Sequence, residues 1–361
     1  MKNATSKNLM LIAVLICATY LPLSAQDIVY TNAVNLNIIG KANPTHKPYH
    51  RVDTAKYSNM PQEVKRLFTN SAGLAITFKT NSNTIAARWT TASSYTLSNM
   101  TAIVAKGLDL YIKRDGKWIF AAVARPTGDS SVYTMVRNME DGEKECLLYL
   151  PLYDEIKTLE IGVSEGSKIE AMENPFRKKV VIYGSSILQG ASASRPGMAY
   201  PARMSRRTGV DFINLGLSGR GKMESPVANM LADINADAFI LDCAPNPSPE
   251  EITERTGNLV NVIRKQHPKA PIIMVQSVVR ESGNFDMKAR ERVEAQNKNF
   301  KREFEKLKSS GIDDIYYIEG ELLGTDHEGT TDGTHPNDLG FDRMLKVIEP
   351  AVINILTRYG I

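Results

Sequence analysis

Three residues of this chain have the types and the spacing that nucleophilic catalysis requires. Ser186 follows an apolar run within the string GSSILQG (184–190), and Asp332 precedes His335 by three positions in the string DGTHP (332–336). A serine hydroxyl is a weak nucleophile until a base takes its proton, and a carboxylate beside a histidine holds the imidazole in the useful tautomer. These residues therefore predict a triad of Ser186, His335 and Asp332.

Hydrogen-bond donors for a developing oxyanion could come from two further loops. Gly219 ends the string NLGLSG (214–219), and a glycine amide can approach a substrate oxygen without interference from a Cβ atom. Asn246 follows the next apolar run and offers a side-chain amide. Together with the backbone amide of Ser186, these groups form the expected oxyanion site.

Each of these features also has a purely structural interpretation. A Gly-Ser-Ser string is common at strand ends, the string at 332–336 could be a turn before a helix, and asparagine often satisfies loop backbone. His327 is a second candidate for the base, although it could equally be a solvated loop histidine. We favour His335 because only this histidine has an aspartate three residues before it and a proline directly after it.

The elements that must position these residues alternate between strand and helix. Short apolar runs predict strands at 180–183, 212–215, 238–241, 272–276 and 315–318. Helical patterns lie between or after them, at 226–234, 249–265, 287–308 and 339–356. This alternation predicts an α/β domain with a doubly wound parallel sheet, in which ligands bind at the carboxyl ends of the strands. The candidate residues would then meet at one edge of the sheet, which favours an enzyme.

The first half of the chain has a different pattern. Short alternating or apolar runs, separated by turn residues, predict strands at 74–79, 84–89, 109–113, 118–123 and 158–163. Strands at such intervals predict an antiparallel β-sandwich. A boundary near 173–175 then separates an N-terminal domain at 27–174 from an α/β domain at 176–361.

The order and spacing of the candidate residues resemble the SGNH, or GDSL-type, hydrolase superfamily over about residues 178–358. Its first block matches Gly184, Ser186 and Gly190, with Ser185 in place of the usual aspartate, and the resemblance implies that Ser186 is the nucleophile. The resemblance also implies a flavodoxin-like α/β fold. The later blocks fall on Gly219, Asn246, Asp332 and His335.

A second resemblance covers the N-terminal half. The strings GLDLY (107–111) and ASRPGMAY (193–200) are similar to a bacterial subgroup of these esterases, which implies an N-terminal GxDLY-type β-sandwich domain. One departure from the superfamily pattern concerns Asn246, which lies in the string APNP (244–247) without the usual flanking glycine and aspartate. The oxyanion role of Asn246 therefore rests on an incomplete block.

The resemblance implies a serine esterase that hydrolyses carboxylic esters through an acyl-enzyme. By analogy with the subgroup, we expect a carbohydrate O-acetyl esterase that acts on small-molecule or oligosaccharide esters. The alternatives are a lipase or lysophospholipase-like esterase, and an inactive protein whose sandwich binds glycans. Arg195 either binds a polar substrate group or anchors its loop through backbone carbonyls. Trp89 and Tyr95 either stack on a sugar or fill the sandwich core.

Composition and the first residues bear on partners and location. Two lysines precede an apolar run at 9–21, which predicts a signal peptide at 1–25 and a periplasmic or extracellular protein without a membrane span; an uncleaved anchor is the alternative. The net charge of +4, without a long run of one sign, indicates no nucleic-acid partner. The histidines show no metal-ligand spacing, so no metal or other cofactor is expected. Cys146 and Cys243 are expected to be buried free thiols.

Overall fold

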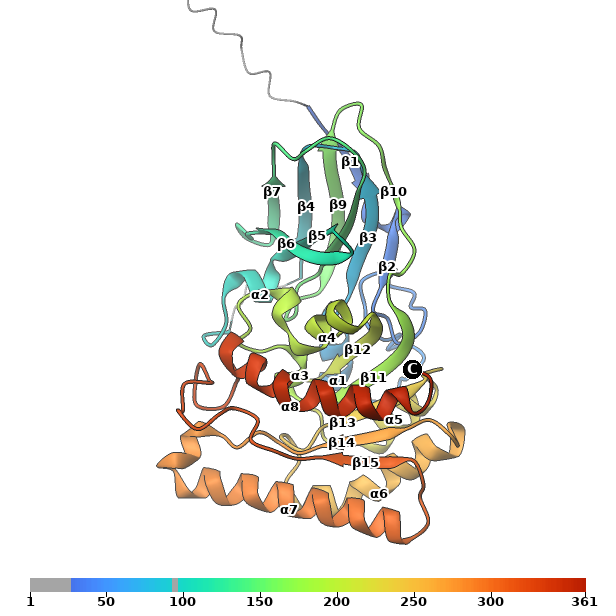
Figure 1. Ribbon diagram of the computed structural model, residues 1–361, viewed down its shortest axis with the longest axis vertical. Helices are drawn as coiled ribbons and strands as arrows, with labels where there is room; N and C mark the ends of the chain where they lie inside the picture. The colour runs from blue at the N-terminus through green and yellow to red at the C-terminus, as the bar shows by residue number, and fades with distance from the viewer. Residues whose placement is uncertain (1–26, 93–96) are drawn as a thin grey trace, which may run out of the picture.

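The computed structural model describes residues 27–92 and 97–361. It places two β-sheets at one end of the molecule and an α/β domain at the other (Figure 1). The predicted signal peptide at 1–25 and the candidate stacking residue Tyr95 lie outside the described residues. Within the described ranges, no helix is both long enough and apolar enough to cross a bilayer.

The first part of the described chain forms two antiparallel sheets. The first sheet has the strand order β1-β9-β4-β7, and the second has the order β10-β3-β8-β5-β6, with β2 paired to β3. Side chains from both sheets share one apolar core, which confirms the predicted β-sandwich. The first sheet comprises β1 (Ile28–Asn32), β4 (Ile85–Thr91), β7 (Ser130–Val136) and β9 (Ile156–Ser164). The second comprises β2 (Asn37–Ile39), β3 (Ala75–Thr80), β5 (Leu108–Arg114), β6 (Lys117–Ala124), β8 (Lys144–Tyr149) and β10 (Ile169–Ala171).

Five of these strands, β1, β2, β7, β8 and β10, were not predicted from the apolar pattern. Strands β2 and β10 have only three residues each, which is too short for an alternation to be recognised. Strands β1 and β7 lie at the two edges of their sheet, where polar residues interrupt the pattern. Strand β8 is buried on both faces along most of its length, so it lacks the alternation of a half-exposed strand.

Trp89 belongs to the sandwich core. The side chain is 1% exposed, and its Nε1 donates a hydrogen bond to the Lys106 carbonyl at 2.9 Å. A buried indole needs such an acceptor for its N–H group. Of the two roles considered for Trp89, the structure therefore supports core packing.

Five parallel strands form the sheet of the α/β domain, in the order β12-β11-β13-β14-β15. The chain runs from β11 to β12 on one side and then crosses to β13 on the other side. This reversal opens a crevice at the carboxyl ends of the central strands, where ligands bind in open α/β sheets. The strands are β11 (Arg177–Gly184), β12 (Val210–Gly216), β13 (Ala238–Asp242), β14 (Ile272–Val275) and β15 (Ile315–Ile318).

Helices cover both faces of this sheet, which confirms the predicted doubly wound fold. In β11, Val180 and Ile182 face one group of helices, whereas Val181 and Tyr183 face the other. Figure 1 shows α8 (red) crossing in front of the sheet and α7 (orange) at the base of the molecule. The first group comprises α3 (Ser186–Gln189), α4 (Tyr200–Thr208) and α8 (Asp338–Thr357). The second comprises α5 (Ser225–Ala232), α6 (Pro249–Gln266) and α7 (Met287–Ser309).

One segment leaves the sandwich between β2 and β3 and packs on the α/β domain. It contains α1 (Gln62–Phe68), and its side chains Val52 and Phe68 share a core with Ile213 of β12. The segment lies in the range 27–174 that the sequence pattern assigns to the N-terminal domain, yet it helps to cover one face of the parallel sheet. The range 27–174 therefore contributes side chains to the core of the sandwich and to a core of the α/β domain.

Candidate active site

Ser186 lies at the turn from β11 into α3, at the carboxyl edge of the parallel sheet. Ser185 caps this helix, because its Oγ accepts a hydrogen bond from the Ile187 amide at 3.2 Å. The turn requires a glycine at position 184, since a Cβ atom on Gly184 would lie 2.1 Å from the Asp242 carbonyl oxygen. Close packing of β11 against β13 therefore sets the position of Ser186. Ser185, which stands where the superfamily pattern has an aspartate, therefore caps the helix.

The Ser186 hydroxyl is hydrogen-bonded to His335, and His335 is hydrogen-bonded to Asp332. The distance from Ser186 Oγ to His335 Nε2 is 2.9 Å, and the distance from His335 Nδ1 to Asp332 Oδ2 is 2.8 Å. Both distances lie within the range expected for a nucleophile with its base and for a base with its orienting carboxylate. The structure thus brings the three candidate catalytic residues into one continuous set of hydrogen bonds.

The loop that carries Asp332 and His335 folds around the carboxylate. Asp332 Oδ1 accepts hydrogen bonds from the amides of Thr334 at 3.0 Å and His335 at 2.8 Å. Burial opposes ionisation, but hydrogen bonds from the His335 amide, the His335 ring and Asn99 outweigh it and lower the pKa of Asp332 to about 2. Asp332 is therefore a carboxylate at neutral pH, and it can stabilise a cationic imidazole.

A residue from the N-terminal half of the chain also contacts this loop. Asn99 lies between β4 and α2 (Ala102–Lys106), and its Nδ2 is 3.0 Å from Asp332 Oδ2 and 3.2 Å from His335 Nδ1. Asn99 was not predicted as a site residue, because a single asparagine among serines and threonines matches no motif. Asn99 and Asp332 are 233 positions apart, so only the fold shows that they meet.

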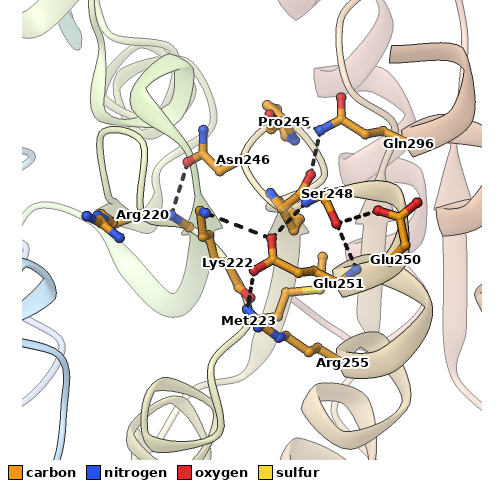
Figure 2. Close-up of polar contacts among 12 residues, drawn as sticks. Arg220, Lys222, Met223, Pro245, Asn246, Ser248, Glu250, Glu251, Arg255 and Gln296 are labelled. Atoms are coloured by element: carbon orange, nitrogen blue, oxygen red, sulfur yellow. Dashed lines mark hydrogen bonds and ion pairs between the residues drawn. The ribbon is translucent and has the colours of Figure 1, made fainter. Parts of the chain in front are cut away.

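Gly219 and Asn246, the expected oxyanion donors, lie on neighbouring loops after β12 and β13. Gly219 has a φ angle of +69°. The Oδ1 atom of Asn246 accepts a hydrogen bond from the Gly221 amide at 3.0 Å. The Nδ2 atom therefore points away from this bond (Figure 2). Gly221 lies against the end of β11, since a Cβ atom there would be 2.3 Å from the Gly184 carbonyl oxygen. Among the described residues, no hydrogen bond joins Ser186 directly to either donor, but both loops meet beside its turn.

Helix α6 ties these two loops together (Figure 2). Glu251 of α6 accepts a hydrogen bond from the Ser248 amide at 2.8 Å, on the loop that carries Asn246. The same carboxylate forms ion pairs with Arg255 at 3.1 Å and with Lys222 at 3.8 Å. Because Lys222 belongs to the loop after β12, one carboxylate links both loops. Glu251 therefore connects the two loops that carry the expected oxyanion donors.

Arg195 lies on the loop after α3 and contacts β5 of the sandwich. Its Nη1 donates to both carboxylate oxygens of Asp109, at 3.0 and 2.8 Å, and to the Tyr111 hydroxyl at 2.5 Å. Asp109 is fully buried and also accepts a hydrogen bond from the Gly197 amide at 2.8 Å. Of the two roles considered for Arg195, these contacts favour anchoring over substrate binding, with a carboxylate as partner in place of backbone carbonyls. The GLDLY string thus joins the sandwich to this loop.

The remaining candidate groups lie in other contacts. His327, the alternative base, is 3.0 Å from Asn284 through its Nδ1, so it bonds to a carboxamide and not to Ser186. Cys146 and Cys243 are both buried, and neither forms a disulfide with another residue in the ranges 27–92 and 97–361. Within the part of the chain that the structure describes, no three His, Cys, Asp or Glu side chains are grouped as metal ligands.

A cavity of about 510 Å³ lies beside the site. Its described lining includes Tyr153 and Ser218 together with Arg66 and Asn70. The Tyr153 hydroxyl donates a hydrogen bond to the Ser186 carbonyl at 3.2 Å, and Ser218 directly precedes the expected oxyanion glycine. The described lining therefore comes from both halves of the chain, and it includes one residue that contacts the Ser186 backbone.

Two family models match the chain. The model of the GDSL-like lipase/acylhydrolase family matches residues 177–353, and the model of the N-terminus of Esterase_SGNH_hydro-type matches residues 28–169. No curated protein matches the chain. Among solved structures, a GDSL-like lipase candidate from Bacteroides ovatus ATCC 8483 is 60% identical over 92% of this chain and 98% of that chain, with a TM-score of 0.91.

Two more distant solved structures have a similar fold. Salicylyl-acyltransferase SsfX3, from a tetracycline biosynthetic pathway, is 19% identical over 92% of this chain and 99% of that chain, with a TM-score of 0.69. An acetyl xylan esterase, Est2A, from the rumen bacterium Butyrivibrio proteoclasticus is 14% identical over 91% of this chain and 99% of that chain, with a TM-score of 0.54. At these identities the similarity establishes a common fold alone.

Proposed function

The chain belongs to the GDSL-like lipase/acylhydrolase family, and on this premise we propose that it hydrolyses carboxylic esters through an acyl-enzyme formed on Ser186. The observation that carries the proposal is the set of hydrogen bonds from Ser186 Oγ to His335 Nε2 at 2.9 Å and from His335 Nδ1 to Asp332 Oδ2 at 2.8 Å. A hydroxyl bonded to an imidazole that is itself held by a carboxylate is arranged as an activated nucleophile.

In the first half of the reaction, His335 Nε2 takes the proton of Ser186 as Oγ attacks the ester carbonyl carbon. The proton makes His335 an imidazolium, which Asp332 stabilises because its low pKa keeps it ionised. The tetrahedral intermediate then collapses. The bond to the alcohol oxygen breaks, His335 returns the proton to that oxygen, and the acyl group stays on Ser186 as an ester.

Three donors would hold the negative oxygen of the intermediate. They are the backbone amides of Ser186 and Gly219 and the Nδ2 of Asn246. The bond from the Gly221 amide to Asn246 Oδ1 supports this assignment, because it directs the carboxamide so that its donor side is available. Loss of one such donor typically lowers the rate by about 10²- to 10³-fold.

In the second half of the reaction, water replaces the alcohol. His335 removes a proton from the water as its oxygen attacks the acyl-enzyme carbonyl, and the same proton then returns to Ser186 Oγ. The products are a carboxylic acid and the regenerated serine.

For the substrate class, we infer an acetylated carbohydrate. The residues that line the cavity beside the site include Arg66 and Asn70, which offer polar contacts to a hydroxylated alcohol portion, next to apolar residues such as Leu67 and Leu97. The fold is also that of an acetyl xylan esterase, although this likeness extends to the fold alone. Export, as expected from the first 25 residues, would bring the protein to acylated polysaccharides outside the cell.

Substitution of Ser186 by alanine tests the nucleophile. We expect Ser186→Ala to lower the hydrolysis of nitrophenyl acetate by about 10³-fold or more, because the acyl group has no acceptor. The matched control is Ser130→Ala, which removes an exposed hydroxyl on β7 and should leave the rate unchanged. A serine-reactive phosphonate should modify the peptide containing Ser186. Wild-type rates in Ser186→Ala would contradict the proposal.

Two substrate comparisons test the finer part of the proposal. Hydrolysis of nitrophenyl acetate should exceed that of the octanoate ester, whereas the reverse order would indicate a lipase-like enzyme. Acetate release from acetylated xylan, mannan and pectin fragments should then identify the sugar. Binding of these glycans by a protein that hydrolyses neither them nor nitrophenyl acetate would indicate a glycan-binding protein and would overturn the esterase proposal.

A further inference from the structure

The carboxylate of Asp332 receives a hydrogen bond from outside its own domain. Asn99 Nδ2 lies 3.0 Å from Asp332 Oδ2, the same oxygen that faces His335 Nδ1 at 2.8 Å. The other oxygen, Oδ1, is occupied by the amides of Thr334 and His335. Asn99 is therefore the donor that shares Oδ2 with the imidazole.

The geometry determines which atom of each side chain faces the carboxylate. If the carboxamide of Asn99 were reversed, its oxygen would face the negative oxygen of Asp332 at 3.0 Å, which is repulsive. Asn99 Nδ2 is also 3.2 Å from His335 Nδ1. Because His335 Nδ1 faces a carboxylate oxygen at 2.8 Å, Nδ1 must be a donor, and since two N–H groups cannot bond to each other, both point at Asp332 Oδ2. This arrangement places the proton of His335 on Nδ1 and leaves Nε2 as the acceptor for the Ser186 hydroxyl.

Asn99 is held from the opposite side by the loop that follows α3. The Ser192 hydroxyl donates a hydrogen bond to the Asn99 carbonyl at 2.7 Å, and the Thr101 hydroxyl donates to the Ser194 carbonyl at 3.1 Å. These contacts join the segment before α2 to the loop just after Ser186. Asn99 is therefore also held by a contact other than the two that it makes through Nδ2.

We propose that Asn99 is a positioning residue for the triad, through which the N-terminal half of the chain sets the orientation and the charge of Asp332. The inference rests on the proposed esterase function. Asn99 does not touch the reacting atoms. It acts through Asp332, by holding Oδ2 in line with His335 Nδ1 and by stabilising the ionised carboxylate.

Removal of this donor should change both the rate and its pH dependence. Without Asn99, the carboxylate is less well oriented, so kcat should fall while KM stays nearly unchanged. We expect a loss of about 10- to 100-fold, the range typical for removal of a hydrogen-bond partner that orients a metal-binding side chain. The carboxylate would also lose a competing donor and hold the imidazolium more strongly. The acid limb of kcat/KM should therefore move to higher pH.

The test compares Asn99→Ala and Asn99→Asp with the wild type and with Ser98→Ala, an exposed neighbour that serves as the matched control. We expect the acid limb to move upward in Asn99→Ala and further upward in Asn99→Asp, because a second carboxylate favours the imidazolium more. Ser98→Ala should keep the wild-type profile. A lower rate with an unshifted profile in both Asn99 variants would mean a merely structural role and would overturn the proposal.

The downfield proton NMR signal of His335 Nδ1 separates this proposal from the esterase proposal, because it needs no substrate. In Asn99→Ala the signal should shift or broaden relative to the wild type, while thermal unfolding shows that the variant is folded. An unchanged signal would overturn the role of Asn99. Absence of esterase activity in the wild type would instead contradict the esterase function, and the signal would still report the contact.

Discussion

Asp332 is the residue whose environment does most to define the site. Its carboxylate accepts hydrogen bonds from two amides of its own loop, from the His335 ring and from Asn99. Burial alone would raise its pKa, but these donors outweigh burial and lower the pKa to about 2. A carboxylate of this kind remains charged at every pH at which an esterase is normally assayed.

We expect Asp332→Asn to lower kcat by about 10³- to 10⁴-fold, because the carboxamide cannot hold the imidazole in the same tautomer or stabilise its charge. In the wild type, protonation of Asp332 should not contribute to the loss of activity between about pH 8 and pH 4. The pKa of Asp332 is lowered to about 2, so this carboxylate is protonated only as the pH falls through about 2. Steady-state rates across this range check both statements. Activity within tenfold of the wild type in Asp332→Asn would contradict the assigned role.

At the scale of elements, the end of α1 is joined to the end of β12 by one buried arginine. The Arg51 side chain donates hydrogen bonds to the carbonyls of Leu67 and Asn70 on one side and of Asn214 and Gly216 on the other. Carbonyls at the C-terminal end of a helix lack partners within the helix, so a cation is favourable there. Burial lowers the pKa of Arg51 to about 9. Through this residue, α1 supports the strand that leads to the Gly219 loop.

Replacement of Arg51 tests this support. Arg51→Met keeps much of the length of the side chain but leaves buried carbonyl groups without donors, so we expect the free energy of unfolding to fall by about 3 kcal/mol or more. Urea unfolding monitored by circular dichroism gives the value. Arg207→Met is the matched control, because Arg207 is 52% exposed and its ion pair with Glu349 should contribute less than about 1 kcal/mol. Equal losses in the two variants would contradict the role assigned to Arg51.

At the scale of the whole molecule, the two halves of the chain are interlocked. The segment between β2 and β3 contributes to a core of the α/β domain, and Asp109 of the sandwich binds Arg195 on the loop after α3. Asn99 then reaches from the first half into the site. Because cores and site both cross the domain boundary, we expect the protein to unfold as one cooperative unit.

The pH dependence of this overall stability should reflect Asp242. Asp242 ends β13, is 4% exposed, and accepts a hydrogen bond from the Tyr200 hydroxyl at 2.8 Å. Burial raises its pKa from 3.8 to about 7, although the Tyr200 bond opposes the shift. The folded protein therefore retains a proton that the unfolded chain has lost, and this contribution to stability is complete below about pH 4 and disappears as the pH rises through about 7.

Asp242→Asn removes this titration and keeps an acceptor for Tyr200. We expect the variant to be more stable than the wild type at pH 8 by on the order of 2 to 4 kcal/mol, with the difference vanishing near pH 4. Urea unfolding at several pH values measures the difference. Asp141→Asn, in an exposed turn, is the control and should show no such trend. A constant difference between Asp242→Asn and the wild type across the pH range would disprove this assignment.

Much of the architecture follows from local sequence patterns. A buried strand appears as a short apolar run, and an amphipathic helix appears as apolar residues at helical spacing. These patterns predicted the strands at 180–183 and 212–215 and the helices at 249–265 and 287–308. The strands missed in the sandwich are short, at a sheet edge, or buried on both faces, so their residues show no regular alternation. The candidate nucleophile and base were found in the same way, since each lies in a recognisable string.

The tertiary structure decided the contacts between distant positions. Asn99 lies 233 positions from Asp332, Arg51 lies 163 positions from Asn214, and Arg195 lies 86 positions from Asp109. No local pattern encodes such contacts, because a hydrogen bond across a domain boundary depends on how two separate cores pack. The sequence by itself therefore determined the kinds of elements and the candidate chemistry, whereas the packing of the sandwich on the α/β domain determined which residues surround that chemistry.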